Sequence, residues 1–222
     1  MRIMNARTRT SFFFAALAAA LLAGCSSVYY GAMEKIGIPK RDILVDRVDA
    51  ARKSQQDAKQ QFASALDQFV AITKVDASGD LETKYNKLND GLKRSEDRAK
   101  AVNERIASVS SVAEALFAEW KNELSQYSDA GLRSQSEAEL KQTRARYDDL
   151  MRTMRGAAAR MDPILAKFRD QVLFLKHNLN ARAVAGLGAT NITLQSDVSG
   201  LIADMEKSIA EAAAFISAMK AQ

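Results

Sequence analysis

The stretch "LETKYNKLNDGLKRSEDRAKAVNERIASVSSVAEALFAEW", from Leu81 to Trp120, decides the fold. Its core positions recur at alternating spacings of four and three residues, and only Ser95 among them is polar. An apolar period of 3.5 residues, held over more than five heptads, predicts a long coiled-coil-like helix. About 45 residues at 1.5 Å each would make a rod close to 70 Å long. The core positions are Leu81, Tyr85, Leu88, Leu92, Ser95, Ala99, Val102, Ile106, Val109, Ala113, Leu116 and Trp120.

Three further helices are expected around this one, at about 41–75, from the 127–136 turn to beyond residue 175, and from about 194 onward. The chain has only two prolines and is rich in strong helix formers. Short turns between long helices predict an all-α, elongated up-and-down four-helix bundle with a coiled-coil-like long central hairpin. The expected stripes are Leu44, Val48, Ala51, Ala58, Phe62, Ala65, Phe69 and Ile72; Leu140, Tyr147, Leu150, Met154, Ala157, Met161, Ile164, Phe168, Val172, Leu175 and Leu179; and Val198, Leu201, Met205, Ile209, Ala212, Ile216 and Met219.

Irregular features punctuate these helices. Turn-forming residues cluster at 76–80, 127–136 and 186–191, and Ser134 with Glu137 resembles a capping pair for the third helix. Pro163 lies inside that helix and predicts a kink, with a complete break as the alternative. Because the central two helices are longest, the tip at 127–136 should project as a two-helix arm that points back toward the start of the chain.

The first 24 residues resemble an export signal. They carry three arginines and no acid, then an apolar run from Phe12 to Ala23. Twelve residues make a helix of about 18 Å, too short for a hydrocarbon core of about 30 Å. The end of the run, Leu22-Ala23-Gly24-Cys25, resembles the lipobox of bacterial lipoproteins, which is cut between its Gly and its Cys. An ordinary signal peptide with an unpaired cysteine is the alternative.

In lipoproteins of that class the cysteine carries a diacylglyceryl group and a further acyl chain, typically palmitate. Cys25 is therefore the expected membrane anchor, and three chains would make release negligible. Ser26 and Ser27 stand where lipoproteins kept in the inner membrane typically have Asp. The resemblance thus implies the periplasmic leaflet of the outer membrane. We expect a signal at 1–24, a lipidated tether at 25–40, and one helical domain at 41–222, with Tyr29 and Tyr30 either at the lipid headgroups or on the bundle.

Charge and cysteine content narrow the function further. The chain has 32 basic and 27 acidic residues, and removing residues 1–24 takes away three arginines and no acid. The remainder is near neutral, which disfavours nucleic-acid binding. Cys25 is the only cysteine, so no disulfide is expected.

The sequence offers little chemistry. His177 is the single histidine, and no phosphate loop, metalloprotease, serine-hydrolase or EF-hand motif is present. We therefore expect no enzymatic activity, cofactor or metal. One polar group lies beside the third stripe, where it either fixes helix register, with Asp76, Asp80, Glu82 or Asp197 as partners, or forms a contact site. Its members are Lys176, His177, Asn178, Asn180 and Arg182.

Two stretches carry a family resemblance. "KRDILVDRVDAARKSQQDAKQQF" (Lys40 to Phe62) and "FRDQVLFLKHNLNARAVAGL" (Phe168 to Leu187) resemble an uncharacterised family of Gram-negative lipoproteins, domain of unknown function 2959. The resemblance covers essentially the whole chain after the signal. It implies a helical envelope protein and brings no activity or site residues with it.

The resulting expectation is a non-catalytic, lipid-anchored periplasmic adaptor or spacer with an envelope-protein or cell-wall partner. A bundle that binds an apolar ligand or lipid beside Met151, Met154 and Met161 is the alternative. A cell-wall enzyme is disfavoured because no catalytic pair is visible. Self-association through the coiled coil stays open, because the outer positions of the repeat carry both charge signs.

Overall fold

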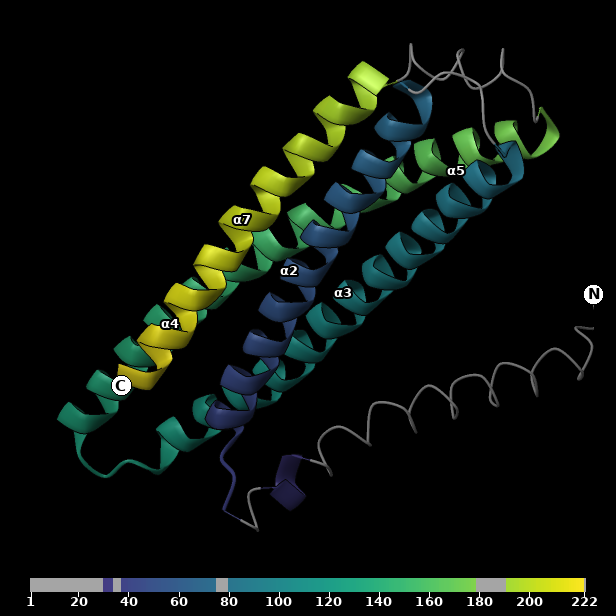
Figure 1. Cartoon of the computed structure of the whole chain (residues 1–222). Coiled ribbons are helices and arrows are strands. Elements are labelled where there is room, and N and C mark those ends of the chain that lie inside the picture. Colours follow the sequence, from purple (N-terminus) through teal and green to yellow (C-terminus); the bar gives the residue numbers. More distant parts are fainter. Residues whose placement is uncertain (1–29, 34–36, 75–79, 179–190, 222) are drawn as a thin grey trace, which may run out of the picture.

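The computed structural model describes residues 30–33, 37–74, 80–178 and 191–221, and their regular structure is entirely helical. A helical turn at 30–33 is followed along the sequence by longer helices (Figure 1). The fold-class prediction of an all-α protein is confirmed. The elements are α2 (Lys40–Lys74), α3 (Leu81–Glu123), the 3₁₀ turn η1 (Leu124–Gln126), α4 (Ala130–Ala159), α5 (Met161–His177) and α7 (Asn191–Ala221).

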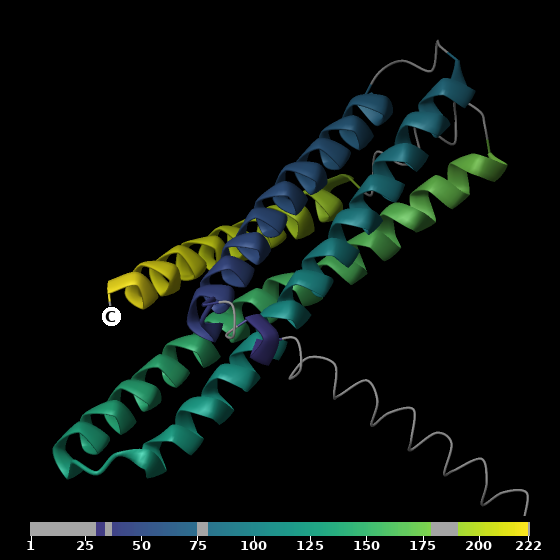
Figure 2. The same ribbon diagram turned by 90° about the horizontal axis from the view of Figure 1, so that it is seen from below.

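The long helices pack antiparallel as an up-and-down bundle. Helix α2 lies between α3 and α7, α4 packs on α7, and both α4 and α5 pack on α3. Helices α4 and α5 follow one another along a common course in both views (Figures 1 and 2). Because of these contacts, α3 and α7 occupy opposite corners of the bundle. The molecule is elongated along the helix axes, as the repeat in α3 predicts.

The stripe predicted for α3 forms the core along most of the helix. Its positions are buried from Leu88 to Ala113, including the polar Ser95. Near the carboxyl end the buried face shifts: Val112 and Phe117 are buried, whereas Leu116 and Trp120 are only half-buried. A straight helix drifts by about 20° per heptad against a 3.5-residue repeat. Phe117 packs against Tyr147 of α4, and beyond the start of α2, near Glu119, the helix faces only α4.

The stripe of α2 is confirmed at every predicted position, and Gln55 fills the gap within it. The stripe of α7 was wrong at Ile209, which is half-buried beside the core position Ser208, whereas Ile216 is partly buried and packs against the core beside Phe215. Ser208 enters the core because its hydroxyl donates to Gln55 Oε1 at 2.9 Å, and both residues are completely buried. Gln55 Nε2 has no acceptor among the described residues.

Pro163 interrupts the third helix without reversing the chain. Proline has no N–H for the carbonyl of Ala159 and its ring crowds that turn. Helix α4 accordingly ends at Ala159 and α5 begins at Met161. Arg160 between them keeps right-handed helical angles, φ −75° and ψ −18°, and its N–H reaches Ala157 O at 3.3 Å. The ladder breaks at one residue, so the core stripe passes from α4 into α5 unbroken.

The α3–α4 turn is shorter than predicted. Helix α4 begins at Ala130, and its N-cap is Asp129, whose side chain accepts from the N–H of Leu132 at 2.9 Å. The predicted capping pair of Ser134 and Glu137 is therefore wrong, because both residues lie inside the helix. An Asp at the N-cap satisfies one of the free N–H groups of the first turn.

The segment before α2 packs on the bundle instead of hanging free. Tyr30 is 6% exposed, and its hydroxyl donates to Ser111 Oγ of α3 at 3.1 Å. Lys40, the first residue of α2, pairs with Glu119 of α3 at 3.0 Å. Of the two positions left open for Tyr30, the structure shows the one on the bundle, while Tyr29 and Cys25 lie outside the described residues.

The buried Gln55–Ser208 pair yields a test of core polarity. Replacing Ser208 by Ala leaves the Gln55 amide buried with no partner, which should lower the free energy of unfolding by about 1–3 kcal/mol. Adding Gln55→Leu removes the stranded amide and should restore or exceed the parent stability. Urea unfolding followed by circular dichroism measures both variants. A double variant as unstable as Ser208→Ala alone would contradict this account of the pair.

Two helical glycines offer a matched comparison. A Cβ added at Gly156 in α4 meets nothing within 4 Å, so Gly156→Ala should stabilise the protein by about 0.5–1 kcal/mol. A Cβ at Gly200 in α7 would lie 2.7 Å from Arg160 Nη1, and Arg160 forms a 3.0 Å ion pair with Asp204. Gly200→Ala should therefore gain less in melting temperature. A larger gain at Gly200 than at Gly156 would refute the comparison.

Candidate functional site

The most distinctive feature outside the core is a two-helix arm, defined here as residues 120–143. The four-helix part of the molecule ends where α2 begins and α7 stops: Lys40 pairs with Glu119, and the Arg41 guanidinium donates to the carbonyl of Met219. Beyond this level α3 and α4 continue alone, as Figure 2 shows. The predicted projection of the central hairpin is confirmed, and its free end lies at the same end of the molecule as the start of α2.

The base of the arm is held by aromatic contacts. The rings of Phe117 and Tyr147 meet edge to face, with centroids 5.4 Å apart and planes at 66°. The Arg144 guanidinium lies 4.9 Å from the Phe117 centroid and 5.9 Å from that of Tyr147. Edge-to-face pairs and cation–π contacts each add to the burial of apolar surface. The arm is thus joined to the bundle by a packed layer.

Within the arm, a polar contact links α3 and α4. Trp120 Nε1 donates to Ser136 Oγ at 2.8 Å, which gives the half-buried indole an acceptor. Ser136 and Thr143 are buried polar residues on α4, and Leu124 of η1 closes the end. These side chains fill the narrow interface between α3 and α4 in the arm.

The tip presents large apolar side chains to solvent. Tyr127 in the turn is 42% exposed and Leu132 in the first turn of α4 is 56% exposed. Charged residues around them carry both signs, as at Lys121, Glu123 and Arg133. Exposed aromatic and aliphatic groups among mixed charges are typical of a protein-contact surface.

The polar group predicted beside the third stripe forms no buried layer among its described members. Lys176 and His177 are exposed in the last turn of α5. Asn178 caps that helix, and its side-chain amide donates to Phe174 O at 3.0 Å. Asn180 and Arg182 lie outside the described residues, as does Asp76 among the suggested partners. A contact role for the group stays a prediction.

The suggested acidic partners have other roles. Asp197 pairs with Lys167 of α5. Asp80 is the N-cap of α3, where the Thr83 hydroxyl and the N–H of Glu82 lower the pKa of its carboxyl. Hydrogen bonds from Lys53 and Arg52 likewise lower the pKa of Asp49. The lowered pKa values favour the ionised carboxylates of Asp49 and Asp80. Their hydrogen bonds stabilise the helices on which these residues lie.

The polar core contacts that the sequence analysis missed lie elsewhere. Besides Gln55 and Ser208, Gln61 of α2 reaches α3, where its amide donates to Gly91 O at 3.3 Å and Ser95 Oγ at 3.4 Å. Gln55 follows Ala51 by four residues and precedes Ala58 by three. That heptad spacing was the signal that could have placed it in the core.

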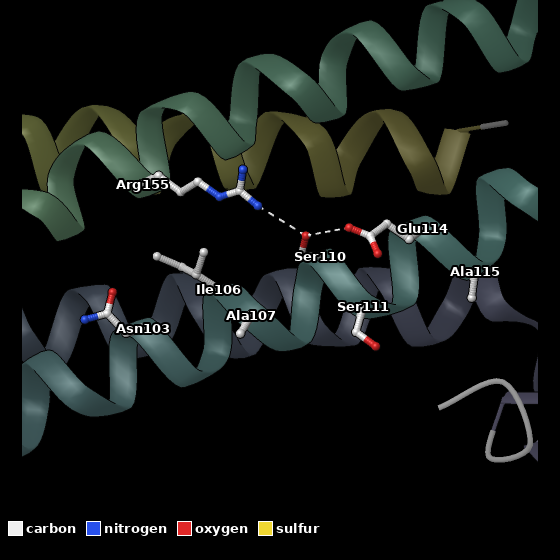
Figure 3. Close-up of a pocket in the computed structure, with 8 residues that line it drawn as sticks. All are labelled: Asn103, Ile106, Ala107, Ser110, Ser111, Glu114, Ala115 and Arg155. Carbon is white, nitrogen blue, oxygen red and sulfur yellow. Dashed lines mark hydrogen bonds between the residues drawn. The ribbon is translucent and has the colours of Figure 1, made fainter. Parts of the chain in front are cut away.

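A shallow groove of about 670 Å³ runs along one face of α3, from Asn103 to Ala115 (Figure 3). Arg155 of α4 borders it and donates to Ser110 Oγ at 3.2 Å, and Ser110 donates in turn to Glu114 at 3.3 Å. The lining mixes small apolar and polar groups. Searches of the described residues find neither a cluster of three or more His, Cys, Asp or Glu placed to hold a metal ion nor a helix long and apolar enough to span a membrane.

The methionines suggested as a ligand slot belong to the core. Met151, Met154 and Met161 are almost completely buried, as are Ala157 and Ala158 beside them. Met151 also borders a surface hollow that is otherwise lined largely by charged and polar side chains, such as Arg144 and Asp148. These residues fill space between helices and give the apolar-ligand alternative no support.

The comparisons with known proteins identify a family that covers the helical domain. No curated protein and no solved structure matches the chain. One family model matches residues 29–219, which is nearly the full length after the predicted signal and includes the segment that carries Tyr30. Its description is "protein of unknown function (DUF2959)". The chain therefore belongs to the DUF2959 family, as its two characteristic stretches predict.

Proposed function

We propose that this protein is a non-catalytic lipoprotein of the Gram-negative cell envelope that acts as an adaptor or spacer. Cys25 carries the lipid and holds the chain in the periplasmic leaflet of the outer membrane. The support for this anchor is the sequence from Phe12 to Ser27, with its short apolar run, lipobox-like end and following serines.

The projecting arm is the single observation that carries the adaptor role. A bundle that served only to fold would gain stability by covering α3 and α4 along their full length with α2 and α7. Here α2 and α7 leave residues 120–143 uncovered, yet Phe117, Tyr147 and Arg144 pack firmly against one another at the base of the arm. A stiff extension with an apolar tip suits binding at a distance from the bundle, because little conformational entropy is lost on contact.

The chemistry of the tip favours a protein partner. Tyr127 and Leu132 supply apolar contact area, and the surrounding charges of both signs supply a polar rim. A cell-wall glycan would be expected to meet a surface richer in exposed aromatic faces and amides. A second copy of the chain is the remaining protein partner, since exposed coiled-coil arms can pair with each other.

Photo-cross-linking in intact cells tests the adaptor role. A photoreactive residue at Arg133, between the tip residues and the body of α4, should capture one dominant envelope protein from the lipidated chain. Tyr127→Ser with Leu132→Ser should reduce that adduct about tenfold, as expected when two apolar contacts worth somewhat over 1 kcal/mol together are lost. Leu173→Ser is the matched control, because Leu173 is 53% exposed but lies on α5.

The possible results separate the roles. An adduct of twice the chain's mass would make the partner a second copy. An adduct that survives the tip variant and disappears with Leu173→Ser would refute the arm as the contact surface. A Cys25→Ala copy that still fractionates with the outer membrane would refute the lipid anchor.

A further inference from the structure

The segment 30–40 fastens the start of the domain to the side of α3. Tyr30 is buried against α3 and donates to Ser111, and Met33 packs against the same core. The N–H of Ile38 donates to Met33 O at 3.0 Å, which ties residues 37–40 to the helical turn at 30–33. Lys40 then pairs with Glu119, so the segment meets α3 at two levels about 12 Å apart. We call the described residues of this segment, 30–33 and 37–40, the strap.

The strap shortens the connection to Cys25. A free tether from residue 25 to residue 40 could reach about 50 Å when fully extended. With Tyr30 fixed on α3, only the five peptide units from Cys25 to Tyr30 remain, and they reach about 18 Å at most. The point of attachment to the rod is Ser111, well away from either end of the molecule.

The lengths on either side of this attachment point exceed that reach. From Ser111 back to Leu81, α3 extends about 45 Å, and from Ser111 forward to Leu124 it extends about 20 Å before the turn. If the rod stood upright with its arm away from the membrane, some 45 Å of bundle would have to fit beneath an 18 Å connection. If it stood on its arm, the connection would be fully stretched and the tip pressed into the headgroups.

We infer that the rod lies along the membrane, with the α3 face from Asn103 to Ala115 turned toward the lipid headgroups. This inference rests on the proposed lipid anchor at Cys25. The face is the one that carries Ser111, where the strap is attached, and the exposed side chains of Ala107 and Asn103 lie on it one and two helical turns before Ser111 (Figure 3). Helix α7 occupies the opposite corner of the bundle and faces the aqueous side.

This orientation decides between the two roles left open by the proposed function. A spacer must hold a partner at a distance along the membrane normal, which a rod lying flat does not do. An adaptor can reach sideways, and here the arm carries Tyr127 and Leu132 along the membrane surface. The predicted partner is therefore an envelope protein that presents its binding surface close to the lipid headgroups.

Fluorescence quenching by lipids tests the orientation. The full lipidated chain is purified and reconstituted into vesicles of phosphatidylethanolamine and phosphatidylglycerol that contain a headgroup quencher. Single cysteines introduced at Ala107, Ala213, Leu132 or Glu82, all exposed positions, carry the fluorophore. Cys25 is acylated and takes no label. Ala107 on α3 should be quenched at least threefold more than Ala213 on α7, and the two end positions, Leu132 at the arm tip and Glu82 at the start of α3, should differ less than twofold.

Strap variants supply the controls. Tyr30→Ala removes the buried ring and restores the long tether, so the difference between Ala107 and Ala213 should collapse. Tyr30→Phe keeps the ring and loses only the hydrogen bond to Ser111, so the difference should persist. A contrast that survives Tyr30→Ala would show that the strap does not set the orientation and would overturn the inference.

The outcomes distinguish this inference from the proposed function. A chain that does not float with the vesicles contradicts the lipid anchor, and the orientation falls with it. A chain that floats, but with one of Leu132 and Glu82 strongly quenched and the other not, contradicts the flat orientation alone.

Discussion

The apolar repeat of α3 is the constraint on which the rest of the structure depends. A helix of 43 residues with a continuous stripe must cover that stripe along its whole length. Helix α2 covers one side of it, and α5 followed by α4 covers the other. Because α3 outlasts α2 and α7 at its carboxyl end, the covering there comes from α4 alone. The rod shape follows from the length of this stripe, and the arm follows from the mismatch in length.

The local periodicity of the sequence made much of this architecture predictable. Every expected core position of α2 is buried, and the third stripe runs through the Pro163 interruption as expected. Such stripes depend only on residue type and spacing, which a single sequence displays. The arm could be anticipated for the same reason, since helix lengths follow from where the stripes and turn residues lie.

The predictions of core positions failed where contacts with residues distant in sequence outweigh the local periodicity. Ser208 is buried in place of Ile209 because Gln55, far away in sequence, accepts its hydroxyl hydrogen. Trp120 moves off the stripe because α3 has lost α2 as a neighbour at that level, and the strap is stabilised by Ser111, 81 residues beyond Tyr30. None of these partners can be identified from spacing along one helix. Asp129 could have been recognised as the N-cap of α4 from the local sequence alone. The nearby Ser134 competed with it as a candidate for the same role.

In the proposed function the arm and the strap act together. The arm extends the apolar Tyr127 and Leu132 beyond the four-helix part, and the strap limits how far the molecule can move from its proposed anchor. Lipid at Cys25, the rod on the membrane and the tip at its end would together place a partner beside the bilayer. The polar groove on α3 and the small residues around Ser111 then belong to the membrane-facing side.

Small-angle X-ray scattering of the chain without residues 1–25 tests the central claim, that a stripe longer than its partners produces a rod with an arm. Helices α4 and α5 alone span about 70 Å, so the account predicts a maximum dimension near 80 Å and a radius of gyration of about 25 Å. A compact domain of this size would have a radius of gyration near 16 Å. A value close to that of the compact domain would contradict the account.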